Sequence, residues 1–453
     1  MPRLFVGNFD FEHRLAAPGR QLPAKLQRLN AELATSWLAI ADDGDYLWTP
    51  ELIDASFFEG AVANGLPKVI PIISFDAVPS RVECVPWGWT DDIRQLCDRH
   101  GWICNDPHDH AVRAANSRRL SSGLEQEWRI GLPFSGEATS FDQIERYIAL
   151  QDKGGRWVIK AEFGMSGRER LLGSGIPVGA DRSWIDKRLN AKGIVFFEPW
   201  VKNVTEVGIQ IDIPREGEPQ LLEAVTMTAD DRGQYSGSRL PSLVTEQTHV
   251  VLRPSDWGLA IDIALQAARR IQSLGYFGPL GIDAMQFRDE NEQLHIRSLQ
   301  DINARWTMGR LSLGFRKLLK PRESAKWMHG PPNINAPVDI PNAITILRSL
   351  LESKGMRLTP ERELVVQAVF EKNEVIDADQ LAEELHQVRV SRSTFYRTLS
   401  LLEEANLIRA VSPDYGPALY LPGTGDQGRC VRTSPALIGG RSAAHCSLLR
   451  IQS

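Results

Sequence analysis

A proline-rich stretch at residues 327–341 divides the chain into two parts of different character. Its sequence, WMHGPPNINAPVDIP, holds four prolines and two asparagines. Because proline lacks a backbone N–H and has a fixed φ, such a run interrupts helices and sheets and is typical of a stiff linker. We therefore predict a linker at 326–341, with separately folded parts before and after it.

The composition excludes several classes of protein. With 42% hydrophobic and 24% charged residues the chain is typical of a soluble globular protein, and its 453 residues predict about three domains. The net charge of −5 means that any DNA contact must come from a local patch. The five cysteines form no CxxC pair, which argues against a disulfide framework and a zinc ribbon. With neither a ~20-residue apolar run nor a signal-peptide pattern, we expect a cytoplasmic protein without a membrane partner.

The part before the linker has two patterns. Residues 1–110 alternate short strand-like and helix-like segments, which predicts an α/β domain. Residues 111–325 carry longer strands. The clearest is EVGIQIDI at 206–213, whose apolar residues alternate with polar or small ones as in a half-buried antiparallel strand.

A lysine and a glycine-containing loop follow one another in WVIKAEFGMSGRERL, residues 157–171. The strand ends at Lys160, and the loop contains Gly164, Ser166 and Gly167. Glycines let backbone N–H groups approach phosphate oxygens, and lysine supplies a point charge. The pair of features predicts a phosphate site, although a plain surface turn has the same appearance.

About thirty residues later, FFEPWVKNVTEVG at 196–208 places two carboxylates around a proline-containing bend. Glu198 ends an apolar run, Val201 follows the bend, and Glu206 begins the next strand. An extended hinge can present backbone groups to an adenine edge, and a following carboxylate can accept ribose hydroxyls. A surface hairpin remains the alternative interpretation.

Hard oxygen ligands gather in GIDAMQFRDENEQLHIRSLQDINARW, residues 281–306. If its two strands pair, Asp283 lies beside Asp301 and Asn303. Two carboxylates and an amide oxygen suit Mg²⁺ bound together with nucleotide phosphates. Arg305 follows where it could neutralise charge on a transferring phosphoryl group.

The order of these features resembles the ATP-grasp superfamily over roughly residues 1–320, with 1–110 as the preceding α/β lobe and 111–325 as a two-lobe clamp around ATP. The resemblance implies the following roles: Lys160 binds phosphate, Gly164, Ser166 and Gly167 form the flexible phosphate loop, Glu198 and Val201 form the adenine hinge, Glu206 binds ribose, Asp283, Asp301 and Asn303 ligate Mg²⁺ (or Mn²⁺), and Arg305 is the closing arginine. An earlier basic residue of the family falls near NSRR, where Arg118 and Arg119 both qualify. The family usually has Glu where this chain has Asp301, and the shorter side chain puts catalysis more in doubt than nucleotide binding.

The chemistry implied by this resemblance is ATP-dependent activation of a carboxylate to an acyl phosphate, followed by attack of an amine or thiol. The substrate is expected to contact the N-terminal lobe and the loops around Arg168, Arg170, Trp306 and Arg310. The sequence names neither the carboxylate nor the amine, and it gives no oligomeric state.

After the linker, a compact helical unit at 342–422 begins with GMRLTPERELVVQAVFEK. Thr359 is a candidate N-cap with proline at the first helical position. We expect the helix that follows to turn the side chains of Leu364, Val365, Ala368 and Val369 toward the core.

The next two helices have the pattern of a helix-turn-helix. Asp377 caps DADQLAEEL, and Ser391 caps SRSTFYRTLSLLEEANLI. In the second of these helices Phe395, Leu399 and Leu402 share one face, which predicts the buried side. Arg392, Thr394, Tyr396 and Arg397 are the candidate DNA-binding residues. IRAVSPDYGPALY then predicts a two-stranded wing.

This unit resembles the DNA-binding half of the ferric uptake regulator family through R-L-T-P-E-R, D-A-D-Q-L and V-S-R-S-T-F-Y-R-T-L-S-L-L. The resemblance implies that Arg392, Thr394 and Tyr396 face the groove and that Arg397 contacts phosphate. Acidic residues equal or outnumber basic ones here, so a winged-helix module that binds protein remains the alternative.

The chain departs from that family after the wing. Where the family continues into a metal-binding dimerisation domain, only Cys430, His445 and Cys446 are present, without ligand spacing, so neither a zinc nor an iron site is expected. Residues 423–453 lack any sustained period and predict disorder. A shifted reading frame or a truncation near Pro422 is one hypothesis for this tail, which resequencing of the coding region would test.

Two functions follow from the sequence. In the first, the chain is an ATP-grasp ligase whose winged helix localises or regulates it. In the second, it is a transcription regulator whose ATP-grasp part is a non-catalytic nucleotide or ligand sensor.

Overall fold

The computed structural model describes the chain in two compact units. The first unit comprises Met1–Ile53 and Ala61–Trp327, and the second comprises Asp54–Gly60 and Met328–Ser453. The description leaves out residues 20–23, 152–154, 165–168, 230–232, 242–253, 331–339, 372–375, 389, 406, 411–418, 423–428, 435–445 and 453. Most of the predicted linker therefore lies outside the described residues. No helix in the described part of the chain is long and apolar enough to cross a membrane.

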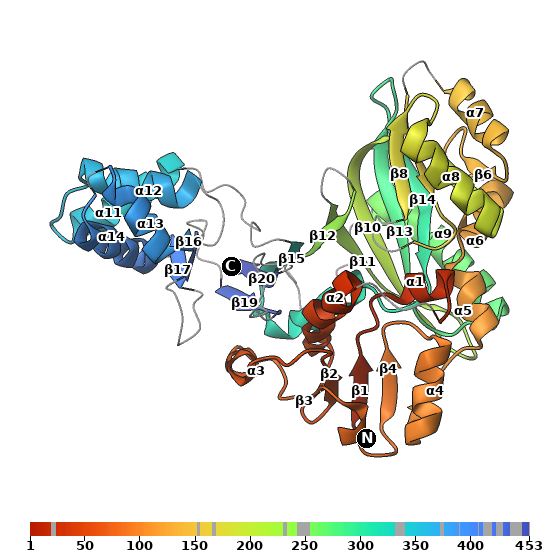
Figure 1. Cartoon of the computed structure of the whole chain (residues 1–453), viewed down its shortest axis with the longest axis horizontal. Coiled ribbons are helices and arrows are strands. Elements are labelled where there is room, and N and C mark those ends of the chain that lie inside the picture. The colour runs from red at the N-terminus through yellow and green to blue at the C-terminus, as the bar shows by residue number, and fades with distance from the viewer. Residues whose placement is uncertain are drawn as a thin grey trace. The chain divides into compact units, whose positions relative to one another are not determined.

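The first unit begins with a parallel α/β sheet in the order β3-β2-β1-β4-β5 (Figure 1). Leu4, Phe5 and Val6 of the central strand are buried on both faces, as parallel strands require. The strand order reverses between β1 and β4, where the carboxyl ends of such a sheet form a crevice. The elements of this lobe are β1 (Arg3–Val6), α1 (Phe11–Ala16), α2 (Ala24–Ala34), η1 (Thr35–Ala39), β2 (Tyr46–Trp48), α3 (Ala55–Ala63), β3 (Ile70–Ile72), η2 (Phe75–Ala77), β4 (Glu83–Pro86), α4 (Asp91–His100) and β5 (Ile103–Cys104).

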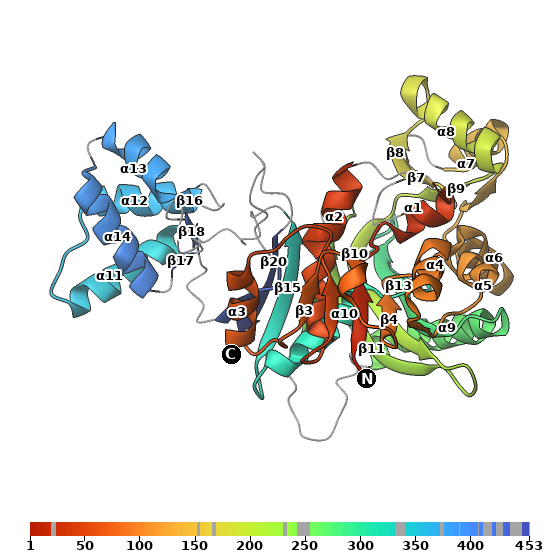
Figure 2. The same cartoon turned by 60° about the horizontal axis from the view of Figure 1, so that its bottom comes forward.

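A four-stranded antiparallel sheet follows, in the order β6-β9-β7-β8. Helices α7 and α8 lie over it (Figure 2), and their apolar residues pack with Trp157, Ile159 and Phe197 of the sheet. The elements are α5 (Asp109–Asn116), α6 (Arg118–Trp128), β6 (Gly136–Ala138), α7 (Phe141–Leu150), β7 (Arg156–Lys160), β8 (Arg170–Ser174), α8 (Gly179–Lys192) and β9 (Val195–Pro199).

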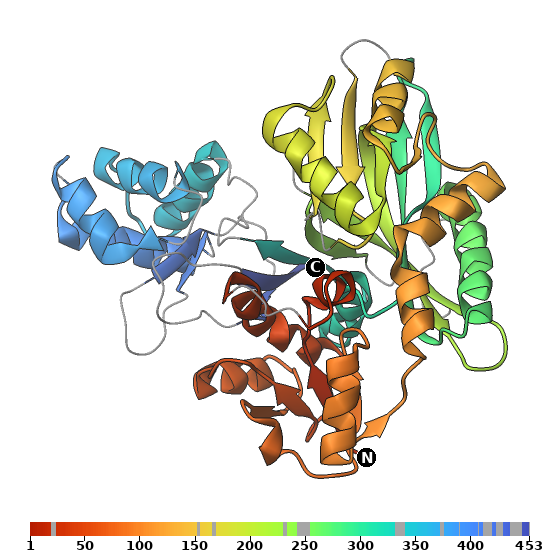
Figure 3. The same ribbon diagram turned by 45° about the vertical axis from the view of Figure 1, so that its right-hand side comes forward.

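The larger antiparallel sheet of the first unit has the order β14-β13-β10-β11-β12-β15. Helices α5, α6 and α9 all pack against β14, and Figure 3 shows them gathered at its side. The predicted apolar residues Val207, Ile209 and Ile211 of β10 are buried, but the prediction of a half-buried strand is wrong, because Gly208 and Gln210 between them are buried too. The elements are β10 (Lys202–Ile213), β11 (Gln220–Ala229), β12 (Tyr235–Leu240), α9 (Pro254–Ser273), β13 (Gly278–Arg288), β14 (Leu294–Asn303), α10 (Met308–Gly314), η3 (Phe315–Leu318) and β15 (Ser324–Gly330).

Gly314 lets α10 approach the N-terminal lobe. A Cβ at this position would lie 2.3 Å from the backbone oxygen of Ala39. Because a backbone atom cannot move aside as a flexible side chain can, Gly314→Ala should lower the free energy of unfolding by about 1–3 kcal/mol. Denaturant titration measures the change. Gly258→Ala in α9 is the matched control, since a Cβ there meets nothing within 4 Å and should stabilise the helix by about 0.5–1 kcal/mol. Equal unfolding free energies for the two variants would contradict the predicted contact.

The second unit contains a helical bundle with a small sheet in the order β16-β18-β17. Its elements are α11 (Ile340–Ser353), α12 (Pro360–Glu371), β16 (Ile376–Asp377), α13 (Ala378–His386), α14 (Arg392–Glu404), β17 (Ile408–Ala410) and β18 (Leu419–Pro422). Asp377 accepts hydrogen bonds from the backbone N–H groups of Asp379 and Gln380, and Ser391 accepts one from that of Thr394. Both predicted caps are therefore confirmed.

The inward face of α12 agrees with the prediction for Val365, Val369 and the partly buried Ala368, but not for Leu364. Its buried residues are Val365, Val366, Val369 and Phe370, whereas Leu364 is 39% exposed. The helix is thus rotated relative to the predicted face, because the large Phe370 packs into the core. The buried side of α14 agrees with the prediction, since Phe395, Leu399 and Leu402 are fully buried.

Two strands lie within the tail for which the sequence predicts disorder. β19 (Arg429–Arg432) and β20 (Cys446–Gln452) pair antiparallel, with Val431 opposite Leu449. Val431, Leu449 and Ile451 are buried. The disorder prediction is therefore wrong for these two segments. It failed because two short strands of mixed composition, separated by a long connection, produce no sustained period. His445 lies outside the described residues.

Candidate functional site

A cavity of about 530 Å³ lies between the two antiparallel sheets of the first unit. Its lining includes Lys160 from β7, Glu198 from β9, Glu206 from β10 and Met285 from β13. Five cationic side chains and two carboxylates line it, so the cavity carries an excess of positive charge. Such a balance favours an anionic ligand.

The lysine predicted to bind phosphate is held by the first hinge carboxylate. The Lys160 ammonium donates to both oxygens of Glu198, at 2.9 and 2.8 Å. The β7 and β9 strands are antiparallel neighbours, and Val158 lies opposite Glu198. The two sequence segments are therefore brought together, but the Glu198 carboxylate faces the lysine.

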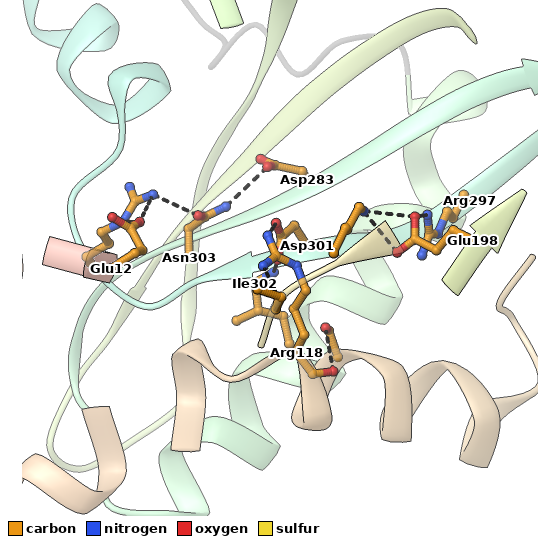
Figure 4. A network of polar contacts seen from close by, with 12 residues as sticks. Glu12, Arg118, Glu198, Asp283, Arg297, Asp301, Ile302 and Asn303 are labelled. Carbon is orange, nitrogen blue, oxygen red and sulfur yellow. Dashed lines mark hydrogen bonds and ion pairs between the residues drawn. The ribbon is translucent and has the colours of Figure 1, made fainter. Parts of the chain in front are cut away.

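Arg297 of β14 joins this pair from the other side (Figure 4). It donates to Glu198 at 2.8 Å through Nη1, and to Glu125 of α6 at 2.7 and 2.8 Å through Nε and Nη2. Burial opposes ionisation of Glu198, but the charges of Arg297 and Lys160 outweigh it and hold the pKa of Glu198 well below its usual range. For Glu125 burial is the larger effect, and its pKa is raised although Arg297 lowers it.

The predicted adenine hinge forms one wall of the cavity. Pro199, Trp200 and Val201 all line it. The guanidinium groups of Arg156 and Arg170 lie 5.6 and 6.0 Å from the centre of the Trp200 ring. The hinge is thus an extended segment with its aromatic side chain fixed by cations.

Glu206, the predicted ribose ligand, also lines the cavity. Burial raises the pKa of its carboxyl, while a hydrogen bond with Gln300 and the charges of Lys160 and Arg170 lower it. A carboxylate in this position can accept hydroxyl hydrogen bonds from a ligand in the cavity.

The predicted metal ligands lie on paired strands. Asp283 is opposite Asp301, and Gly281 is opposite Asn303. The Asn303 amide donates to Asp283 at 3.1 Å, while its oxygen accepts from Arg305 at 2.9 Å (Figure 4). Burial, and then the charges of Asp301 and Glu206, raise the pKa of Asp283 to about 7.

These three side chains are of the types that Mg²⁺ prefers, but their present orientation is not that of metal ligands. Two carboxylates and an amide oxygen are ligands that Mg²⁺ prefers. Ligation would require Asn303 to turn its oxygen toward Asp283. Among the described residues no three His, Cys, Asp or Glu side chains are placed to hold a metal ion by themselves. An ion here would therefore depend on the amide, on water or on phosphate oxygens.

Arg118 contacts this set and Arg119 does not. Arg118 donates to Asp301 at 3.0 Å and to the carbonyl oxygen of Ala161 at 2.8 Å. Arg119 is exposed and donates to Glu162 at 3.2 Å. The structure thus brings the first arginine of the pair to the candidate site. Of the predicted phosphate loop, Gly164 follows β7, while Ser166 and Gly167 lie outside the described residues, as does Arg168.

Arg305 is tied to the N-terminal lobe. It forms an ion pair with Glu12 of α1, and its guanidinium lies 5.2 Å from the centre of the Trp87 ring. The backbone N–H of Trp306 donates to the Trp87 carbonyl oxygen at 3.1 Å. The carboxyl end of the parallel sheet therefore meets the segment that follows the candidate metal ligands.

The predicted DNA-binding residues of α14 are partly engaged by α13. Arg392 donates to Glu383 at 2.8 Å, and the Tyr396 hydroxyl donates to Asp379. The bond to Asp379 raises the pKa of Tyr396 to about 12, so this side chain stays protonated at neutral pH. Thr394 is half-buried near the cap, and Arg397 is exposed. On α14 the Arg397 side chain is thus exposed, and Arg392 is exposed but paired with Glu383.

Sequence reasoning missed three charged residues at the centre of the site: Glu12, Glu125 and Arg297. The one available signal was Arg297 itself, a cation within the predicted strand LHIRSL. A buried cation requires a partner. Its partner Glu125 is 172 residues away along the chain, so no local pattern could have identified it.

Comparisons with known proteins give one family match and several similar solved structures. Residues 353–422 match the model of the ferric uptake regulator family. A search of curated proteins finds no match. Among solved structures, the chain is similar to N5-carboxyaminoimidazole synthetase from Staphylococcus aureus complexed with ADP, at 11% identity and a TM-score of 0.40 over 78% of this chain and 84% of that one.

Two further structures are similar at the same level. Biotin carboxylase from Campylobacter jejuni has 11% identity and a TM-score of 0.42 over 73% of this chain and 76% of that one. The biotin carboxylase domain of Hydrogenobacter thermophilus 2-oxoglutarate carboxylase, in complex with MgADP and bicarbonate, has 12% identity and a TM-score of 0.43 over 99% of this chain and 85% of that one.

Proposed function

We propose that the first unit binds Mg·ATP in the cavity between its antiparallel sheets and transfers the γ-phosphoryl group to a carboxylate substrate. The observation that carries this proposal is one cavity lined by a phosphate-type lysine and a ribose-type carboxylate, with a hard-oxygen metal set at neighbouring positions of the strands that line it. Lys160 and Glu206 line the cavity. Asp301 directly follows the lining residue Gln300, and Asp283 lies two residues before the lining residue Met285.

Each part of the site has a task in this proposal. Backbone groups of 199–201 meet the adenine edge, and Glu206 accepts the ribose hydroxyls. Lys160 and the positive lining bind the phosphates, and Asp283, Asp301 and Asn303 would hold Mg²⁺, which supplies charge stabilisation to the phosphoryl group. Arg305, paired with Glu12, would neutralise charge on the transferring phosphoryl group.

The reaction is written for a carboxylate and an amine. A carboxylate oxygen of the substrate attacks the γ-phosphorus, the bond from that phosphorus to the β–γ bridging oxygen breaks, and ADP leaves. The amine nitrogen then attacks the acyl carbon, phosphate departs, and the nitrogen loses a proton to form the amide. A thiol would give the thioester by the same route.

An ADP-release screen tests this proposal. The full chain is incubated with Mg·ATP and pools of amino acids, peptides and other amine–carboxylate pairs, with Lys160→Ala as background. ADP release that requires both a carboxylate and an amine, and that Lys160→Ala lacks, is the expected result. If the native chain releases no more ADP than Lys160→Ala with every pool, the proposed ligase activity is contradicted.

The match of residues 353–422 to the ferric uptake regulator family favours a second candidate function. In this alternative the chain is a DNA-binding regulator, and the first unit senses a nucleotide without turning it over. Mg·ATP that binds, is not hydrolysed, and changes the affinity of the full chain for a DNA duplex would support the regulator over the ligase.

A further inference from the structure

Four charged side chains form a continuous buried network on one side of the cavity. Lys160 contacts Glu198, Glu198 contacts Arg297, and Arg297 contacts Glu125. Their side chains are between 3 and 12% exposed. Figure 4 shows Glu198, which lies on β9, and Arg297, which lies on β14, side by side. Charges alternate along the network and sum to zero, which is the arrangement that buried charges require.

Within this network Glu198 has two cationic partners of different kinds. Lys160 lines the cavity at the end of β7, on a flexible side chain. Arg297 is fixed, because its Nε and Nη2 donate to the two oxygens of Glu125 at 2.7 and 2.8 Å. Such a two-point contact holds a guanidinium in one orientation. The third guanidinium nitrogen, Nη1, is thereby aimed at Glu198.

A nucleotide phosphate must compete with Glu198 for the lysine. If Lys160 turns toward phosphate, Glu198 loses one cation but keeps Arg297, so no buried carboxylate is left uncompensated. Without Arg297, Lys160 would be the one remaining cation in contact with Glu198 among the described residues. Turning it away would then leave a buried charge alone, at a cost of several kcal/mol.

Resting on the nucleotide site proposed above, we propose that Arg297, held by Glu125, is a positioning residue that retains Glu198 and so releases Lys160 to bind phosphate. Without a nucleotide, Lys160 stays paired with Glu198. The Arg297–Glu125 pair lowers the free-energy cost of moving Lys160 from Glu198 to the phosphate, because Glu198 keeps Arg297. Arg297 itself need not touch the nucleotide.

Calorimetric titration of the full chain with Mg·ATP, together with its thermal unfolding midpoint, tests the proposal. Arg297→Met should weaken ATP binding roughly tenfold or more, since Lys160 becomes the sole counter-charge of Glu198. Glu198→Gln/Arg297→Met, which removes the competing carboxylate as well, should restore affinity to within about threefold of the native chain. Arg316→Met is the control: it breaks the ion pair with Glu223, and neither residue lines the cavity, so it should lower the unfolding midpoint yet leave ATP affinity within about twofold.

Arg297→Lys guards against a failure of Arg297→Met to fold. Lysine retains the positive charge but cannot make the guanidinium's hydrogen bonds to Glu125 and Glu198 together. The ATP affinity of Arg297→Lys should therefore lie between those of Arg297→Met and the native chain. Native affinity in Arg297→Met, or a double variant as weak as Arg297→Met, would overturn the inference. A native chain that shows no Lys160-dependent ATP binding would overturn the nucleotide site itself, and the inference with it, so the two failures are distinguishable.

Discussion

Asp283→Asn should lower kcat/KM for Mg·ATP turnover about 10³-fold, because Mg²⁺ contributes several kcal/mol to the stability of the transferring phosphoryl group. Asp283 is buried opposite Asp301, and its neutral amide replacement keeps the shape but loses the charge that attracts the ion. ADP release measured across a Mg²⁺ titration separates weaker binding of Mg²⁺ from a lower rate at saturating Mg²⁺. The apparent Kd for Mg²⁺ should rise, and excess Mg²⁺ should recover only part of the rate.

Asp289→Asn is the matched control for this change. Asp289 lies in the turn of the same β13–β14 hairpin, where it accepts hydrogen bonds from the backbone of Asn291 and Gln293. The chemical change is identical, but Asp289 neither lines the cavity nor belongs to the predicted metal ligands, so turnover should stay within about twofold of the native chain. Equal activity in Asp283→Asn and Asp289→Asn would exclude Asp283 as a metal ligand.

Asp301→Glu introduces the glutamate that the ATP-grasp superfamily usually has at this position. Asp301 is engaged by Arg118 at 3.0 Å. A longer side chain reaches one methylene further toward Asp283, so the variant should bind Mg²⁺ at least as well as the native chain if the strand spacing allows it. Weaker binding would indicate that the strands are already spaced for the shorter carboxylate.

Local patterns predicted those parts of the site whose partners are neighbours in a hairpin. The short turn between the two strands at 281–306 makes them pair, so Asp283 could be expected beside Asp301 and Asn303, and the observed pairing confirms that Asp283 lies opposite Asp301. A register shift between Asp283 and Met285 sets this alignment, and the turn alone does not predict it. The caps of α13 and α14 were equally predictable, because an N-cap contacts residues two or three positions away.

The remaining features depend on contacts that no local pattern encodes. Arg305 is paired with Glu12 across 293 residues, and Arg297 with Glu125 across 172. Glu198 was assigned to the hinge, but its carboxylate contacts Lys160 because β7 and β9 are neighbours in the sheet. The inward face of α12 was mispredicted at Leu364 for a similar reason, since the choice between Leu364 and Phe370 is made by the core around them.

Removing two carboxylates of α13 should strengthen DNA binding by the full chain. Asp379 and Glu383 hold Tyr396 and Arg392, and both acidic side chains would lie close to the phosphate backbone in a helix-turn-helix complex. Asp379→Asn/Glu383→Gln frees Arg392 and removes two negative charges, at roughly 1 kcal/mol of repulsion for the pair, so affinity should rise about fivefold. Fluorescence anisotropy with a labelled duplex of mixed sequence measures the change.

Salt dependence distinguishes this electrostatic account from a change in folding. If Arg392 becomes a phosphate contact, the slope of log Kobs against log salt should steepen by about one unit in the double variant, whereas Arg397→Ala should reduce it by about one. Glu403→Gln/Glu404→Gln removes the same charge at the far end of α14 and should change affinity much less. Equal gains from the two double variants would show a general charge effect, and no gain from either would favour a winged helix whose partner is protein instead of DNA.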